Sequence, residues 1–142
     1  MRFHAEDLKL ILKHPFETAH GRVTSRTSVV LRIEDGEFEG LGEAPACDYL
    51  GQEACTTRKA LEEMAAYLTP DPLQLEENLS TLGERFPERP AALCAVDIAL
   101  HDLIGKKLDV PLYGLFGLSS GEARKTSFTL GIDTPDKVLE KL

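Results

Sequence analysis

The sequence predicts an α+β fold, in which a three-stranded antiparallel meander is followed by a helical bundle. Leu8, Leu10 and Leu12 alternate with their neighbours at period two, which is typical of a half-buried strand. An Asp35-Gly36 pair separates two further strand-like runs, and such a pair favours a hairpin turn because the turn needs residues that accept a positive φ. Farther along, apolar residues recur at helical spacing. These patterns place the strands before the helices.

The three strands are expected around residues 8–12, 28–33 and 38–41. Between the first two lies a polar stretch that contains Pro15 and Gly21. At residues 15–27 this stretch is longer than a hairpin connection needs, and long loops are often functional or mobile. We therefore expect a loop there, with a candidate role in binding.

Three helices and a short turn are expected after the strands. The first carries an apolar stripe and ends at Thr69-Pro70, and the second runs from Leu73 to about Gly83. The third begins near Pro90 and ends near Gly105, with alanines that let another element approach closely. Glycine closes a short helical turn at residues 111–117. The apolar stripes are formed by Leu61, Met64, Ala65 and Leu68, and by Leu93, Val96, Leu100 and Leu103.

A domain boundary is expected at Ser119-Ser120-Gly121, which divides the chain into residues 1–121 and 122–142. Beyond it, residues 125–132 have strand character and Thr134-Pro135 looks like the start of a helix. A strand that leads into a helix is the first half of a βαβ unit. Because the sequence stops at Leu142 inside that helix, we interpret the chain as truncated.

Composition limits the possible partners. The formal net charge is −8, from 24 acidic and 16 basic side chains, whereas a nucleic-acid binder needs a basic face. No apolar run approaches the roughly 20 residues that span a bilayer, and charged residues near Met1 argue against a signal peptide. Three cysteines without CxxC spacing indicate reduced thiols. We expect a cytoplasmic protein that binds neither nucleic acid nor membrane.

The residues alone give few candidates for chemistry. Asp97 and His101 are four apart on the third predicted helix, and the pattern favours a structural ion pair over a general base or a metal site, which needs more ligands. In residues 15–27, an arginine or histidine could bind a substrate carboxylate. A second candidate loop, residues 46–51, follows the third strand. Without further information both segments are most simply solvated loops.

Several short runs together carry a resemblance to a known family. The helix run AVDIALHDLIGKK and the turn after it resemble the enolase-superfamily signature of the muconate-cycloisomerase-type branch, and GEAP is similar to the same branch. Two further runs, PFETA and TSFTLGID, are most similar to the dipeptide epimerases of this branch, of which the Ala-Glu epimerases are familiar members. The runs are AVDIALHDLIGKK at 95–107, VPLY at 110–113, LFG at 115–117, GEAP at 42–45, PFETA at 15–19 and TSFTLGID at 126–133.

The resemblance implies an enolase N-terminal-like cap, residues 1–121, joined to the start of a truncated (β/α)₇β barrel, residues 122–142. In the family, two mobile loops of the cap close over the barrel mouth and set specificity, and the two candidate loops occupy those positions. A substrate-contacting threonine maps onto Thr129. Substrate-binding candidates in the two loops are Arg22, with Arg26 or His20 as substitutes, and Asp48 and Tyr49.

The implied activity is Mg²⁺-dependent dipeptide epimerisation by 1,1-proton transfer through an enediolate. The family's catalytic lysines and Mg²⁺-binding carboxylates lie on later barrel strands, so no catalytic residue and no metal ligand is expected in this chain, which we predict to be inactive alone. The full enzyme would act on a small dipeptide and form a homo-oligomer. A muconate cycloisomerase, an o-succinylbenzoate synthase and a non-catalytic split subunit or interaction module stay open as alternatives.

Overall fold

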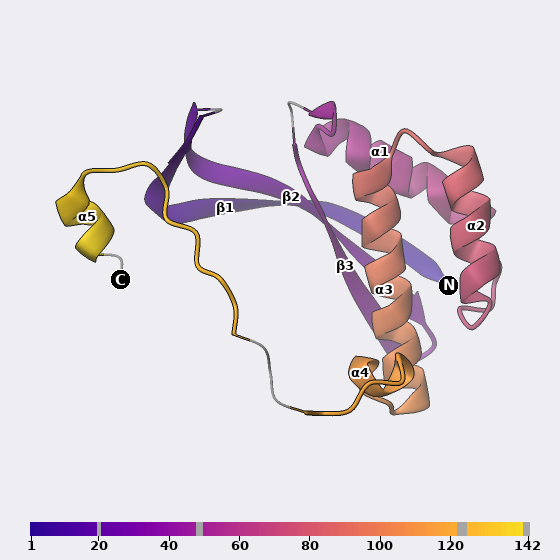
Figure 1. The fold of residues 1–142 in the computed structure, drawn as a ribbon. Coiled ribbons are helices and arrows are strands. Elements are labelled where there is room, and N and C mark those ends of the chain that lie inside the picture. The colour runs from indigo at the N-terminus through magenta and orange to yellow at the C-terminus, as the bar shows by residue number, and fades with distance from the viewer. Residues whose placement is uncertain (20, 48–49, 122–124, 141–142) are drawn as a thin grey trace.

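A computed structural model describes residues 1–19, 21–47, 50–121 and 125–140. Its three strands are β1 (Arg2–Thr18), β2 (Gly21–Asp35) and β3 (Phe38–Pro45). They form one antiparallel sheet in the order β1-β2-β3, so the predicted meander is confirmed (Figure 1). Gly36, with φ of 64°, turns the chain between β2 and β3, as the Asp35-Gly36 pair predicts.

The prediction of a loop at residues 15–27 is wrong, because the structure has strands there. β1 and β2 stay paired out to Thr18 and Gly21, and together they form an arm that leaves the helices and curves away (Figure 1). None of the described side chains of residues 12–27 is fully buried, so polar residues suit the arm even though the backbone is strand. The register shifts once, between Ile11 and Phe16, and such irregularities increase strand twist. The polar composition therefore indicated exposure to solvent rather than a loop.

The helices follow the predicted order, and those before α5 pack as the bundle that the sequence predicts. Within the described ranges, no helix combines the length and apolarity that crossing a bilayer demands. The helices are α1 (Ala54–Met64), the short 3₁₀ helix η2 (Ala65–Tyr67), α2 (Leu75–Arg85), α3 (Pro90–Leu108), α4 (Leu112–Leu115) and α5 (Pro135–Glu140).

The strand expected at residues 125–132 is absent. These residues form no ladder, and their only backbone hydrogen bond to another part of the described chain runs from Ile132 N to Glu17 O. A strand needs a neighbouring strand for its backbone groups, and no second barrel strand is present among the described residues. α5 does begin at Pro135, after Thr134, as expected. The domain boundary at residues 121/122 stays a prediction.

The core lies between one face of the sheet and the helices. Val29, Leu31 and Ile33 alternate along β2 and are each 0% exposed, as are Leu61 of α1 and Leu100 of α3. α3 lies directly on β3 (Figure 1). Its small alanine side chains therefore do what the sequence predicts, because they allow helix and strand to approach closely.

Two glycines of β3 make this approach possible. A Cβ atom on Gly40 would lie 2.0 Å from the backbone oxygen of Ala99, and one on Gly42 would lie 1.9 Å from that of Ala95. Both distances are far inside van der Waals contact, so the strand tolerates no side chain at either position.

Side chains of α3 also bind the outer edge of β3. Asp102 accepts a 2.9 Å hydrogen bond from the backbone N–H of Leu41, and Lys106 donates one of 2.9 Å to the carbonyl of Glu39. Lys106 also lies 2.6 Å from Asp102, so the two side chains form one unit. Backbone groups that a neighbouring strand would use are thereby occupied.

A second lysine of α3 anchors the end of β2. Lys107 Nζ donates to a carboxylate oxygen of Asp35, and this hydrogen bond holds the pKa of Asp35 below its ordinary value of 3.8. Because the folded pKa is the lower one, the pair stabilises the fold above pH 3.8, and this contribution is lost as the pH falls through the folded pKa. Lys107 thus links the last turn of α3 to the β2–β3 hairpin.

Lys107→Gln is expected to lower the free energy of unfolding at pH 7, and the difference from the wild type should shrink as the pH falls below 3.8. Urea unfolding of both proteins between pH 7 and pH 2.5 measures this difference. A difference that does not change over this range would contradict the role given to the Asp35 carboxylate.

Candidate functional site

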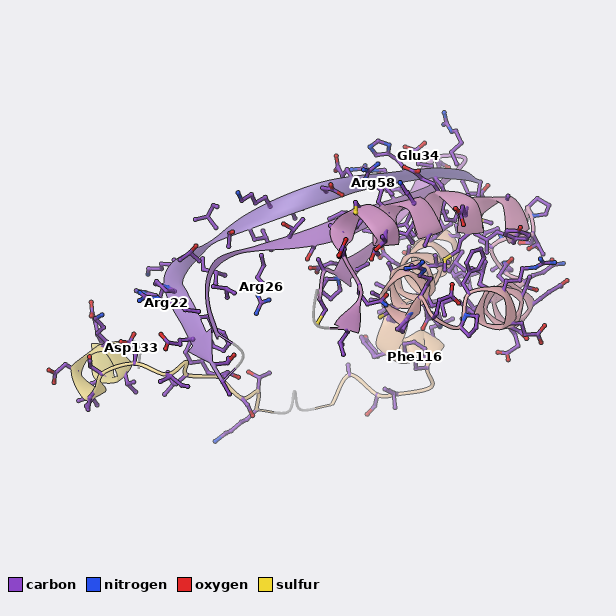
Figure 2. All side chains as sticks on the ribbon, turned by 90° about the horizontal axis from the view of Figure 1, so that it is seen from above. Arg22, Arg26, Glu34, Arg58, Phe116 and Asp133 are labelled. Atoms are coloured by element: carbon purple, nitrogen blue, oxygen red, sulfur yellow. The ribbon has the colours of Figure 1, made fainter. Side chains whose placement is uncertain are left out.

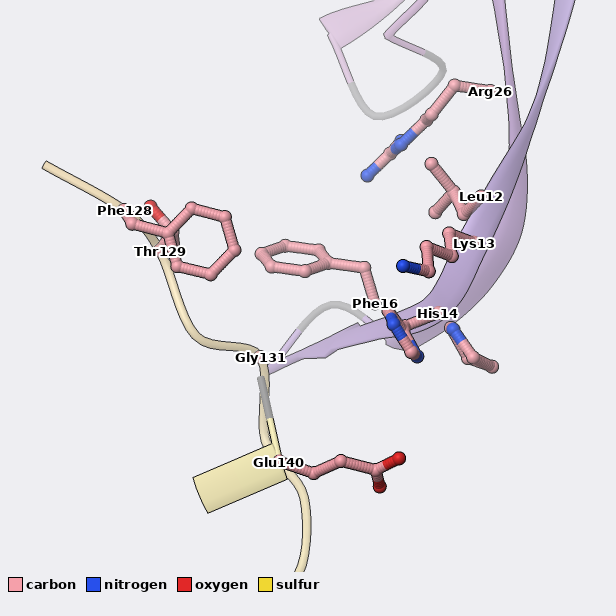
Figure 3. A pocket seen from close by; sticks show the side chains of 10 residues that line it. Leu12, Lys13, His14, Phe16, Arg26, Phe128, Thr129, Gly131 and Glu140 are labelled. Atoms are coloured by element: carbon pink, nitrogen blue, oxygen red, sulfur yellow. The ribbon is translucent and has the colours of Figure 1, made fainter. Parts of the chain in front are cut away.

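The concave side of the β1–β2 arm faces the segment that leads to α5, and a cavity of about 680 Å³ lies between them (Figure 3). Its volume falls within the range of ligand pockets, which is roughly 300–1,000 Å³. β1 forms one wall of the cavity, and the segment before α5 forms the opposite wall. Arg26 of β2 extends over the cavity. The lining residues are Leu12, Lys13, His14, Pro15, Phe16, Arg26, Phe128, Thr129, Gly131 and Glu140.

Backbone contacts hold the two walls together. Ile132 N donates a 2.9 Å hydrogen bond to Glu17 O near the end of β1. Beside it, a Cβ atom on Gly131 would lie 3.1 Å from Glu17 N and 3.2 Å from Glu17 O, so glycine permits the close passage. This junction sets how far residues 128–131 lie from the arm, and therefore how wide the cavity is.

The cavity combines apolar and charged groups. Phe16 and Phe128 point toward one another across it, and Arg26 extends from β2 into the same space (Figure 3). Neither Arg26 nor Lys13 has a hydrogen bond or ion pair with another described residue, so both cations are available to a ligand. Glu140 of α5 is the one carboxylate among the lining residues. This arrangement suits a ligand with an anionic group beside an apolar part.

The structure brings together two of the predicted site residues, Arg26 and Thr129. Arg22 is not part of the lining. It lies opposite Glu17 near the end of the arm, on the convex side, whereas Arg26 points into the concave side (Figure 2). His20, Asp48 and Tyr49 fall outside the described residues.

Sequence reasoning missed the lining residues Lys13, Phe16, Phe128 and Glu140. For Lys13 a signal existed: the alternation of residues 8–12 indicates a strand, and extending that strand by one residue places Lys13 on the arm. For Phe128 and Glu140 there was no such signal, since they reach the cavity only through a contact distant in sequence.

Asp97 and His101 form the structural pair that their spacing favours. His101 Nδ1 lies 2.8 Å from Asp97 Oδ1, and the imidazole ring packs at 5.1 Å between centroids against Phe116, which follows α4. Neither residue lines the cavity. The pair therefore joins α3 to the turn after it.

The described residues do not fit a magnesium site. Mg²⁺ takes carboxylate and other oxygen ligands in near-octahedral geometry, and nowhere in the described part of the chain do three or more His, Cys, Asp or Glu side chains gather to hold an ion. The cavity lining contains Glu140 together with Lys13 and Arg26, and these two cations disfavour the binding of a further positive charge.

Comparison with known proteins assigns the family. Residues 5–117 match the family described as mandelate racemase / muconate lactonizing enzyme, N-terminal domain. The L-Ala-D/L-Glu epimerase of Bacteroides thetaiotaomicron is 40% identical over 141 residues, which cover 99% of this chain and 36% of that protein.

Solved structures agree on the fold. A dipeptide epimerase from Enterococcus faecalis V583, complexed with Mg and the dipeptide L-Leu-L-Tyr, superposes with a TM-score of 0.87 at 32% identity over 98% of this chain and 40% of that one. The 2-chloromuconate cycloisomerase of Rhodococcus opacus 1CP reaches 0.89 at 18% identity, over 99% of this chain and 40% of that one, and shares the fold. The chain thus spans well under half the length of these relatives. It belongs to the mandelate racemase / muconate lactonizing enzyme family of the enolase superfamily and contains that family's N-terminal capping domain.

Proposed function

We propose that the chain is the capping and specificity part of a Mg-dependent dipeptide epimerase that acts by 1,1-proton transfer. The observation that carries the proposal is the cavity, which is lined both by the hydroxyl-bearing Thr129 and by the guanidinium of Arg26, a group without a partner among the described residues. Relatives that cover almost all of this chain support it, because they are epimerases of dipeptides.

Each cavity residue then has a role in binding. Arg26 forms charge-assisted hydrogen bonds to the side-chain carboxylate of an acidic dipeptide, and Thr129 hydrogen-bonds a polar group of the dipeptide backbone. Phe16 and Phe128 cover the apolar part and exclude water. None of these side chains is suited to remove a proton from carbon, and the described residues form no metal site. We therefore assign proton transfer and Mg²⁺ to regions that the longer relatives have beyond the match, and expect this chain to be inactive alone.

The charge of the cavity favours an acidic dipeptide. Lys13 and Arg26 stand against the single carboxylate Glu140, so an additional anionic side chain gains attraction, whereas a cationic one meets like charge. L-Ala-L-Glu is the expected kind of substrate, in preference to a dipeptide of lysine and arginine.

A chimera tests the proposal. This chain would replace the matching 141 residues of the Bacteroides thetaiotaomicron epimerase. In D₂O the chimera is expected to exchange the α-hydrogen of L-Ala-L-Glu for deuterium, detected by proton NMR, while the chain alone exchanges none. Circular dichroism establishes that the chimera is folded. A folded chimera that converts muconate or a succinylbenzoate precursor and leaves dipeptides unchanged would contradict the epimerase assignment, and exchange by the isolated chain would contradict the assignment of catalysis elsewhere.

A further inference from the structure

The outer edge of β1 carries backbone groups that have no hydrogen-bond partner among the described residues. Thr27 of β2 lies opposite Lys9, yet its carbonyl accepts a 3.0 Å hydrogen bond from Ala46 N on the other side. In an antiparallel sheet the backbone groups of one residue face a single neighbouring strand. The N–H and C=O of Lys9 therefore point away from β2, and period two extends this to every second residue of the regular part of β1. The outward-facing residues are Phe3, Ala5, Asp7, Lys9 and Ile11.

In the described chain α1 touches this edge through a side chain, because Arg58 Nε lies 3.3 Å from Asp7 Oδ1, but its backbone groups stay uncovered. No hydrogen bond joins these backbone groups to another described residue, and every side chain from Glu6 to Ile11 is exposed. Three of them are large and apolar: Leu8 and Leu10 are each 43% exposed, and Ile11 is 74% exposed. The opposite edge of the sheet differs, because Asp102 and Lys106 occupy two backbone groups of β3, Leu41 N and Glu39 O. An open edge of this length is a template for another strand.

We propose that this edge pairs with the same edge of a second copy of the chain, antiparallel, about a two-fold axis at Leu8. Residues whose backbone groups point outward must lie opposite such residues of the second copy, because only these groups can hydrogen-bond across the interface. Since they alternate along β1, the two-fold axis must pass through a residue and not between two residues. An axis at Asp7 or at Lys9 sets two identical charges opposite each other. An axis at Leu8 sets Asp7 opposite the second copy's Lys9, and Lys9 opposite its Asp7.

The rest of this register is also complementary. Ala5 lies opposite Ile11, and Leu8 meets Leu8 at the axis. An axis at Leu10 would also bring Asp7 opposite a lysine, but that lysine is Lys13, which lies beyond Ile11 where the strand register shifts. The Leu8 axis uses only the regular part of β1, so it is the register that the charges and the geometry favour together.

Cysteine cross-linking tests the axis. In a background with Cys47, Cys55 and Cys94 replaced by serine, Leu8→Cys places the two thiols at a pair whose Cα atoms lie about 4.5 Å apart, within reach of a disulfide. Leu10→Cys is the matched control, with equal exposure. Its two copies are offset by four residues, roughly 13 Å, which a disulfide does not span. Mild oxidation is expected to yield covalent dimer from Leu8→Cys and not from Leu10→Cys; equal yields, or the reverse order, would overturn the proposal.

A charge swap tests the partner. Lys9→Asp alone sets Asp7 against Asp at the axis, and Asp7→Lys alone sets lysine against Lys9, so each variant should dimerise about tenfold or more weakly than the wild type. Mixed together, the two variants restore both opposite-charge pairs and are expected to form a heterodimer. Sedimentation velocity measures each sample. A monomeric wild type at high concentration, dimerisation unchanged in the single variants, or a mixture that stays monomeric would each overturn the proposal.

Discussion

Gly42→Ala is expected to lower the free energy of unfolding by about 3 kcal/mol, because overpacking a close-packed site costs of that order. The added methyl group would lie 1.9 Å from the backbone oxygen of Ala95 and 2.8 Å from its carbonyl carbon. Both atoms belong to the backbone of α3, so no side-chain rotation relieves the overlap, and the helix must move off the sheet. A loss of this size is a large fraction of the 5–15 kcal/mol that typically separates folded from unfolded domains.

Urea unfolding followed by far-UV circular dichroism measures this loss. Gly40→Ala should behave similarly, since its methyl group would lie 2.0 Å from Ala99 O. The matched control is Gly83→Ala in α2, where no atom lies within 4 Å of the added methyl group. There the higher helix propensity of alanine should raise stability by up to about 1 kcal/mol. Equal effects at Gly42 and Gly83 would contradict the close packing of α3 on β3.

Arg26→Ala, made in the epimerase chimera, is expected to lower kcat/KM for L-Ala-L-Glu about 10- to 100-fold. A hydrogen bond to a charged group contributes about 1.5–3 kcal/mol, and its loss appears directly in kcat/KM. Because Arg26 has no partner among the described residues, its replacement removes a ligand contact without breaking a contact between described side chains. The neutral dipeptide L-Ala-L-Leu should be affected much less, since we assign Arg26 to the side-chain carboxylate.

Arg22→Ala is the matched control for this prediction. It removes the same side chain four residues away on the same strand, but from the convex side of the arm (Figure 2). Its kcat/KM for L-Ala-L-Glu is expected to stay within about twofold of the parent chimera, as is usual for surface substitutions. A larger loss from Arg22→Ala than from Arg26→Ala would assign the carboxylate to Arg22 instead.

Patterns within single elements predicted most of the fold. Alternation at Leu8, Leu10 and Leu12 predicts β1, and the Asp35-Gly36 pair predicts the β2–β3 hairpin. The helical spacing of apolar residues predicts α1, α2 and α3. The strands at residues 15–27 have no clear apolar alternation to distinguish them from a loop, because two of their half-buried positions on β2, Ser25 and Thr27, are polar. The composition of residues 125–132 predicts a strand, but whether a segment becomes a strand depends on pairing with a neighbouring one.

The candidate site was predictable only in part. Thr129 and Arg26 came from the family resemblance and from the type of side chain that binds carboxylates. The aromatic pair Phe16 and Phe128 joins positions more than a hundred residues apart, and their approach depends on the contact between Ile132 and Glu17. No periodicity within one element encodes such a contact.

Asp102 and Lys106 are four apart on α3, a spacing that stabilises helices in countless proteins. Here the same two side chains also occupy Leu41 N and Glu39 O of β3. A strand that approached β3 would find these two groups already occupied, whereas no described residue occupies the outward-facing groups of β1. We therefore expect strand pairing at β1 to be favoured over pairing at β3, which favours association of two chains over growth into a filament.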